Sequence, residues 1–231
     1  MSLYRLDAMG VTIDGRDLVR GVSLEIAPGE CVALAGASGS GKSLTSLTPF
    51  GLSAGTITGS AVLEGQDLAG LDEAGLRRVR RASVGFVFQQ PLTALTPHRT
   101  AAQHLTESAM QAGGARPDRN TLVAMLDAVG LADPAIKLRR YPHQLSGGER
   151  QRLMIACAIA HKPKLLIADE PVSALDAHLR AEIMALLTRL RRETGMGLLL
   201  VSHDLASLEH HADRVLVMQG GQVVEAGAAQ A

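Results

Sequence analysis

Residues 36–43, which read GASGSGKS, have the composition of a loop that holds a polyphosphate. The segment follows one apolar run, 31–35, and precedes another, so it stands in the strand–loop–helix setting that the G-x-x-x-x-G-K-S motif requires. Its three glycines allow backbone dihedral angles that a Cβ excludes, and the loop can turn its N–H groups inward onto phosphate oxygens. A helix beginning near Lys42 adds the positive end of its dipole. The predicted phosphate contacts are Gly36, Ala37, Ser38, Gly39, Ser40, Gly41, Lys42 and Ser43.

Two carboxylates, Asp169 and Glu170, stand directly after the apolar run 165–168. A buried strand that ends this way places both at the carboxyl edge of its sheet, where ligands of open α/β folds bind. Lys42 supplies a cation for the outer phosphates, whereas the Ser43 hydroxyl and Asp169 are suited to hold Mg²⁺. Glu170 is suited to accept a proton from an attacking water, which contributes about 10²–10⁴ in rate. Loop and carboxylates together predict a nucleoside triphosphatase.

The segment 145–149 reads LSGGE and predicts a second anion site. Ser146 and Glu149 have the spacing of a capping box, and the stretch 153–160 is apolar almost all round, as in a buried helix. Gly147 and Gly148 leave the first amides of this helix uncovered, at the positive end of its dipole. By itself the segment would be a well-capped helix; its place among the other motifs favours anion binding.

The elements that must position these residues are those of an α/β fold with a largely parallel sheet. Short apolar runs bounded by Gly or Pro alternate with helical stretches, and near-continuous hydrophobic runs are typical of strands covered on both faces. Strand-like pieces near the N-terminus predict a small antiparallel layer, and Gly220-Gly221 predicts a hairpin turn. The predicted strands are 3–9, 22–26, 31–35, 61–63, 84–88, 165–168, 197–201, 215–218 and 223–225, and the predicted helices include 100–112, 121–129 and 177–193.

Length and composition predict one domain over 1–231, with an α/β core formed by 1–90 and 161–231 and a helical lobe at 91–160. The 23 Lys and Arg balance 23 Asp and Glu, which argues against a general polyanion binder and predicts no nucleic-acid partner. Two cysteines cannot form a disulfide framework, which favours a reducing compartment. We expect no signal peptide and no membrane-spanning segment, since charges interrupt every apolar run.

Two other classes of phosphate-loop protein fit less well. Signalling GTPases select guanine with an Asn-Lys-x-Asp motif, but the only asparagine is Asn120, which precedes Thr121. A small-molecule kinase of the phosphate-loop type stays possible, although it would leave LSGGE unexplained.

With these motifs in this order, the chain resembles the ATP-binding subunits of ABC (ATP-binding cassette) transporters over essentially its whole length. The resemblance implies a RecA-like phosphate-loop NTPase core and a head-to-tail dimer that encloses two ATP molecules. The phosphate loop of one chain would face 146–148 of the other. The matching segments are GASGSGKS at 36–43, Gln89 after 84–88, LSGGE at 145–149, LLIADE at 165–170, SALD at 173–176, and Ser202, His203 and Asp204 after 197–201.

The resemblance assigns further roles residue by residue. Gln89 would sense Mg²⁺ and the γ-phosphate while linking to the membrane subunit; the Pro two positions later selects Gln89 over Gln90. His203 would contact the γ-phosphate and the attacking water, and 173–176 would cross the dimer interface. The other seven histidines are taken as structural.

Two positions depart from the family pattern. An aromatic residue usually stacks on the adenine, yet the nearest equivalent position here is about Ile13. Because stacking contributes about 1–3 kcal/mol per base, selectivity for adenine is expected to be weaker. Leu44 stands where Thr is common and leaves only its backbone N–H for the α-phosphate. Since Lys42, Glu170 and His203 are present, a hydrolysing cassette is still predicted.

The segment 90–97 resembles the stretch after the glutamine in dipeptide, oligopeptide and nickel importers, most of all the shorter nickel-type members. The resemblance implies an energy-coupling ATPase on the cytoplasmic face of the inner membrane. Its partners would be a second cassette (identical or not), integral membrane permease subunits docked near 91–110, and indirectly a solute-binding protein. Alternatives are a soluble ABC-type ATPase acting on nucleic acid or the ribosome, and a non-hydrolysing regulatory cassette.

Overall fold

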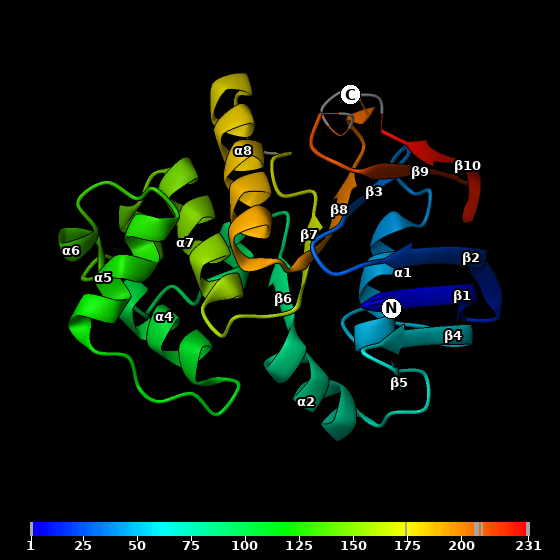
Figure 1. Cartoon of the computed structure of the whole chain (residues 1–231), viewed down its shortest axis with the longest axis horizontal. Coiled ribbons are helices and arrows are strands. Elements are labelled where there is room, and N and C mark those ends of the chain that lie inside the picture. The colour runs from blue at the N-terminus through cyan, green and yellow to red at the C-terminus, as the bar shows by residue number, and fades with distance from the viewer. Residues whose placement is uncertain (1, 174, 206–207, 209, 230–231) are drawn as a thin grey trace.

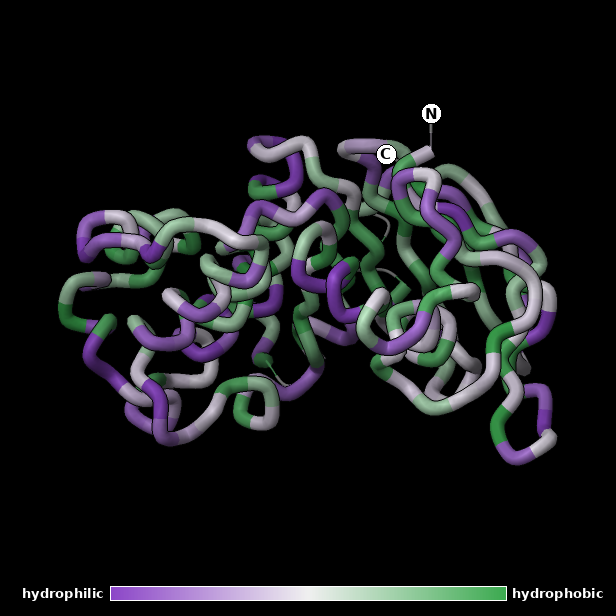
Figure 2. Tube along the Cα trace, turned by 90° about the horizontal axis from the view of Figure 1, so that it is seen from below, coloured by the Kyte–Doolittle hydropathy of each residue, from purple (hydrophilic) through white to green (hydrophobic). Residues whose placement is uncertain are grey.

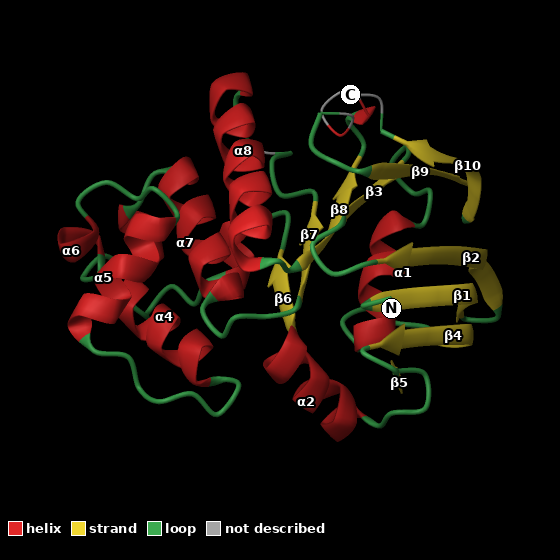
Figure 3. Cartoon of the chain, in the orientation of Figure 1, coloured by secondary structure: helices red, strands yellow, loops and turns green. Residues whose placement is uncertain are grey.

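The computed structural model describes residues 2–173, 175–205, 208 and 210–229. Two β-sheets lie side by side, and most helices gather beyond the larger sheet, on the side away from the smaller one (Figures 1 and 3). The strands are β1 (Tyr4–Ile13), β2 (Arg16–Ile26), β3 (Cys31–Ala35), β4 (Thr56–Leu63), β5 (Gln66–Asp67), β6 (Val84–Val87), β7 (Leu165–Asp169), β8 (Gly197–Ser202), β9 (Arg214–Gln219) and β10 (Gln222–Ala228).

Five of the α-helices begin at a short polar side chain that accepts a hydrogen bond from one of the otherwise unpaired first amides. Asp72, Thr100, Asp118, Ser146 and Asp176 each accept from a backbone N–H three residues later. The α-helices are α1 (Lys42–Leu47), α2 (Glu73–Ser83), α3 (Pro91–Ala94), α4 (Ala101–Met110), α5 (Arg119–Ala128), α6 (Pro134–Lys137), α7 (Gly147–Ile159) and α8 (Ala177–Thr194), and the 3₁₀ turns are η1 (Thr48–Phe50) and η2 (Pro142–Gln144).

The larger sheet brings four loops to one edge. Its strand order is β10-β9-β3-β8-β7-β6, and every pair except β10–β9 is parallel. The carboxyl ends of β3, β8, β7 and β6 therefore lie at the same edge, and the four segments that follow them carry the sequence-predicted chemistry. The smaller sheet, of order β2-β1-β4-β5, is antiparallel.

The two faces of the larger sheet belong to different hydrophobic clusters, as alternation along a strand requires. In β3, Cys31, Ala33 and Ala35 pack with the helices, whereas Val32 and Leu34 pack toward the antiparallel sheet. Phe50 is fully buried on the latter side. The trace coloured by hydropathy shows green, hydrophobic strands in the interior and purple stretches along the outer loops (Figure 2).

The predicted fold class is confirmed: a mostly parallel sheet, an antiparallel N-terminal layer, and helices inserted between β6 and β7. Several bounds were wrong. The N-terminal strands are longer, because backbone pairing continues through polar residues, and β5 was missed. Strand β6 ends before Phe88, and the helix after the phosphate loop ends at Leu47, where the 3₁₀ turn Thr48–Phe50 follows it.

The region 91–160 contains helices and loops only, as predicted. Its buried side chains join the same hydrophobic cluster as one face of the larger sheet, so the helices are packed onto the sheet. Across the described residues, every helix is too short or too polar to cross a bilayer.

Candidate functional site

The loop after β3 adopts the glycine-dependent shape that the motif predicts. Gly36 has φ 148°, and a Cβ there would lie 2.3 Å from the carbonyl oxygen of Met218. Gly41 has φ 100° and occupies the N-cap of α1. The β9–β10 hairpin supports the loop, because the Gly221 N–H donates to the Ser40 carbonyl over 3.0 Å. The sequence-predicted loop is thus fixed on a sheet edge at the start of a helix.

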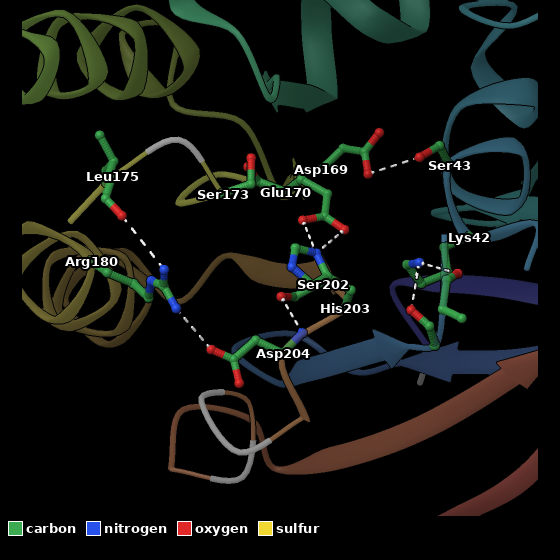
Figure 4. Close-up of polar contacts among 12 residues, drawn as sticks. Lys42, Ser43, Asp169, Glu170, Ser173, Leu175, Arg180, Ser202, His203 and Asp204 are labelled. Atoms are coloured by element: carbon green, nitrogen blue, oxygen red, sulfur yellow. Dashed lines mark hydrogen bonds and ion pairs between the residues drawn. The ribbon is translucent and has the colours of Figure 1, made fainter. Parts of the chain in front are cut away.

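Lys42 and Ser43 point to different partners at the start of α1 (Figure 4). The buried Lys42 ammonium donates to the carbonyl oxygens of Gly36 (2.8 Å) and Ala37 (2.9 Å), inside the phosphate loop. The Ser43 hydroxyl lies 3.1 Å from Oδ1 of Asp169, the last residue of β7. Strands β3 and β7 are both neighbours of β8, which explains how residues 126 positions apart meet.

Burial raises the pKa of Asp169, and the Glu170 charge adds to this, although the Ser43 hydrogen bond and Lys42 oppose it. A buried carboxylate beside a hydroxyl is a site that a small cation would stabilise, because the cation offsets the cost of desolvating the charge. No cluster of three or more His, Cys, Asp or Glu side chains suited to a metal occurs among the described residues. The Ser43–Asp169 pair therefore suits an ion that takes few protein ligands.

Glu170 and His203 face each other at the edge of the sheet (Figure 4). His203 Nδ1 lies 2.7 Å and 2.9 Å from the two carboxylate oxygens of Glu170. The Glu170 backbone has φ 52°, unusual for a residue with a side chain, and its N–H donates to the Val201 carbonyl of β8 over 2.9 Å. The carboxylate is held beside the loop that carries the histidine, whose side chain is 58% exposed.

A cleft of about 800 Å³ joins these parts. Gln89, two residues beyond β6, lines it together with Glu170 and His203. The cleft is lined by Leu18, which is 41% exposed, and by Leu44, but not by Ile13, which packs against the buried core between the sheets. The full lining is Leu18, Ala37, Ser38, Gly39, Gly41, Lys42, Ser43, Leu44, Gln89, Glu170 and His203.

The segment 146–148 does not line the cleft at the phosphate loop. Ser146 caps α7: its hydroxyl accepts from the Glu149 N–H over 3.2 Å, and the Glu149 carboxylate accepts from the Ser146 N–H over 2.7 Å. The first residues of α7 line a separate opening of about 420 Å³ that shares no residue with the cleft at the phosphate loop. Within one chain, the two predicted anion sites are therefore not brought together.

A pH-dependent contribution to stability is expected from Glu149. Burial raises its pKa, but hydrogen bonds from Lys137 and Ser146 outweigh burial, so the pKa is lowered overall. A lowered folded-state pKa stabilises the fold above the ordinary value of 4.5 and ceases to do so as pH falls through the lowered value. Gln at this position keeps the capping box and removes the charge.

We therefore expect Glu149→Gln to lower Tm at pH 7 and the difference from the wild type to shrink as pH falls below about 4.5. Thermal unfolding followed by circular dichroism at several pH values measures this. A difference in Tm that stays constant with pH would contradict a role for the charge.

Sequence reasoning missed two residues that shape the site. Leu18 lies in a polar stretch of β2, so no hydrophobic run marked it. Gln151 is buried and donates to the Pro171 carbonyl over 2.6 Å, which ties α7 to the loop after Glu170. The only signal for Gln151 was a polar residue on an otherwise apolar helix, a pattern with many other causes.

Comparison with known proteins agrees with this geometry. Residues 19–173 match the family model described as ABC transporter. The chain is 44% identical over 227 residues to the oligopeptide transport ATP-binding protein OppD of Mycobacterium bovis, covering 96% of this chain and 36% of that protein. It is 40% identical over 234 residues to the dipeptide transport ATP-binding protein DppD of Bacillus subtilis, covering 98% of this chain and 70% of that protein.

The chain thus spans only about a third of the length of the first of these relatives. Among solved structures, it is similar to a dimeric ATP-binding cassette in a post-hydrolysis state bound to ADP and phosphate. The TM-score is 0.86 and the identity 30%, with 99% of each chain covered.

Proposed function

The chain belongs to the ABC transporter family, and from that premise we propose that it binds and hydrolyses ATP to power peptide import through separate membrane subunits. The observation that carries the proposal is the convergence of Lys42, Asp169, Glu170 and His203 at one sheet edge. The relatives named for oligopeptide and dipeptide transport favour a peptide over nickel as the cargo.

ATP would bind with its phosphates in the loop 36–43, where Lys42 and the inward amides neutralise charge. Mg²⁺ fits the Ser43–Asp169 pair, since this ion takes few protein ligands and completes its shell with water and phosphate oxygens. When bound, it would neutralise charge developing on the phosphates. Gln89, which follows β6, would face Mg²⁺ and the γ-phosphate from the side of that strand. Leu18 would offer the adenine base an apolar surface in place of an aromatic ring.

In the hydrolysis that we propose, a water oxygen forms a bond to the γ-phosphorus, and the bond from that phosphorus to the oxygen it shares with ADP breaks. Glu170 accepts the proton that the water loses. His203 holds the carboxylate through Nδ1 and presents its exposed ring to the cleft, where it can reach the γ-phosphate. The products are ADP and inorganic phosphate.

A dimer explains why the segment 146–148 lines an opening that is separate from the cleft at the phosphate loop. Bare amides at the start of α7 form an anion site, and a second chain in head-to-tail orientation would supply the phosphate. The similar cassette that was solved with ADP and phosphate is itself a dimer. Part of the predicted interface segment 173–176, namely residue 174, lies outside the described residues. The partner would be an identical or a related cassette.

A groove of about 540 Å³ beside β6 is where we propose that a permease subunit docks. Residues of α4 and of the segment 94–96, within the region 91–110 singled out above, line the groove together with arginines of α2 and residues of α7. Three arginines of α2 and only one carboxylate, Glu107, are among the described residues that line the groove, so the groove suits an acidic partner segment. Strand β6 also lines the groove, and Gln89, two residues after its end, lines the ATP cleft, so this strand runs from the groove toward the cleft.

Docking there would place the chain on the cytoplasmic face of the inner membrane as a peripheral subunit, with a solute-binding protein acting on the other side. The alternative of an ATPase acting on nucleic acid or the ribosome is not favoured, because the relatives are named for peptide transport and the net charge is zero.

Removing the Lys42 charge tests nucleotide binding. Lys42→Ala is expected to weaken ATP binding about 10- to 100-fold, since a hydrogen bond to a charged group contributes about 1.5–3 kcal/mol. Equilibrium titration with a fluorescent ATP analogue measures this. Lys164→Ala is the control, because Lys164 is 62% exposed and pairs with Glu64 at the opposite edge of the sheet. Equal affinities for both variants would contradict the proposed phosphate site.

A further inference from the structure

Arg180, in the first turn of α8, contacts two of the loops that surround the site (Figure 4). Its Nη1 donates to Oδ2 of Asp204 over 3.1 Å, and its Nη2 makes a longer contact of 3.5 Å to the Leu175 carbonyl. Asp204 follows His203 directly, and Leu175 belongs to the segment 173–176. One side chain thus connects the histidine loop to the segment that leads into α8.

Both loops are also tied to Glu170. The N–H and the hydroxyl of Ser173 donate to the Glu170 carbonyl over 3.3 and 3.2 Å. On the other side, the Asp204 N–H donates to the Ser202 hydroxyl over 3.1 Å, which anchors the histidine loop to the end of β8. With the contact between His203 and Glu170, these interactions form a closed ring to which α8 contributes Arg180.

The chemistry of arginine suits this position. A guanidinium is a planar fork that can donate to two acceptors in fixed directions, whereas an ammonium is a point charge on a flexible stem. The side chains of Arg180 and Asp204 are 37% and 33% exposed, so their pairing contributes little to overall stability. The pairing matters for orientation, because a small misplacement of a reacting group can lower a rate strongly.

We propose that Arg180 is a positioning residue for hydrolysis, which holds the loop of His203 in register with Glu170 through Asp204 and Leu175. The inference rests on the proposed ATPase function. Arg180 is absent from the lining of the cleft at the phosphate loop, so its effect is on turnover and not on ATP binding.

Steady-state kinetics separate these effects. Arg180→Gln and Asp204→Asn are each expected to lower kcat about 10-fold, which corresponds to about 1.4 kcal/mol on the barrier, with KM changed less than about twofold. The double variant should be no slower than either single variant, because both remove the same link. Arg180→Lys should recover only part of kcat. Arg192→Gln, an exposed arginine in the last turn of the same helix, is the control.

Hydrogen exchange of the nucleotide-free chain tests the link independently of activity. Arg180→Gln should speed exchange of amides in 197–205, whereas Arg192→Gln should not. If the two variants differ in exchange in this way but the wild-type chain never hydrolyses ATP, the proposed function is overturned and the structural link through Arg180 stands. Unchanged kcat and exchange in Arg180→Gln, a raised KM at constant kcat, or additive losses in the double variant would each overturn the positioning role.

Discussion

Glu170→Gln should reduce ATP hydrolysis by about 10²–10⁴-fold, the range for loss of a general base, while ATP binding persists. The substitution keeps the size of the side chain and one oxygen for His203 Nδ1, so the loop geometry is retained. Lys42, Ser43 and Asp169 are untouched, and the phosphate site remains intact. What is lost is the carboxylate that can take the proton from water.

Release of inorganic phosphate measures the rate, and the fluorescent ATP analogue measures binding. Glu225→Gln, an exposed position in β10, is the matched control and should turn over like the wild type. With hydrolysis blocked, ATP is expected to accumulate between two chains, and size-exclusion chromatography should show an ATP-dependent dimer. Turnover of Glu170→Gln near the wild-type rate would reject Glu170 as the base.

The sequence was most informative where a physical requirement leaves few residue choices. Gly36 and Gly41 were predicted from the phosphate-loop motif, which needs backbone angles that a Cβ excludes, and both have positive φ. Asp169 was placed at the carboxyl edge of the sheet because it directly follows a buried apolar run, and it is the last residue of β7. The fold class followed from the same alternation of apolar runs and helices, and it is confirmed. The roles of individual site residues remain predictions.

Contacts between segments distant in sequence were not predictable. The local sequence does not show that the Gly221 N–H donates to the phosphate loop. This contact depends on the pairing of β9 with β3 and of β10 with β9. The same holds for Leu18, which reaches the cleft only through the path of β2, so the expectation placed at Ile13 missed it. In the sequence Arg180 is like any other charged helix residue, because its partner Asp204 lies 24 positions away. Each of these contacts depends on tertiary packing, which a local sequence pattern does not show.

Gly147 offers a direct test of the dimer. It is exposed at the start of α7, and a Cβ added there would meet nothing within 4 Å. At the neighbouring Gly148, a Cβ would lie 2.7 Å from a methyl group of Leu179, so its replacement would disturb the chain itself. Leu at position 147 should be tolerated by the monomer, because Gly is about 1 kcal/mol less favourable than Ala inside a helix and Leu is a good helix former.

In the Glu170→Gln background, Gly147→Leu should therefore weaken ATP-dependent dimerisation at least about 100-fold, equivalent to about 2.7 kcal/mol, since a bulky side chain would occupy the space proposed for the partner's phosphate. ATP binding to the monomer should be unchanged, because the cleft at Lys42 shares no residue with the opening at Gly147. Analytical ultracentrifugation measures the dimer. Gly70→Leu, another glycine with open space and an ordinary φ, is the control. If Gly147→Leu dimerises as tightly as Gly70→Leu, no phosphate of a partner lies against the start of α7, and the two anion sites do not meet across a dimer.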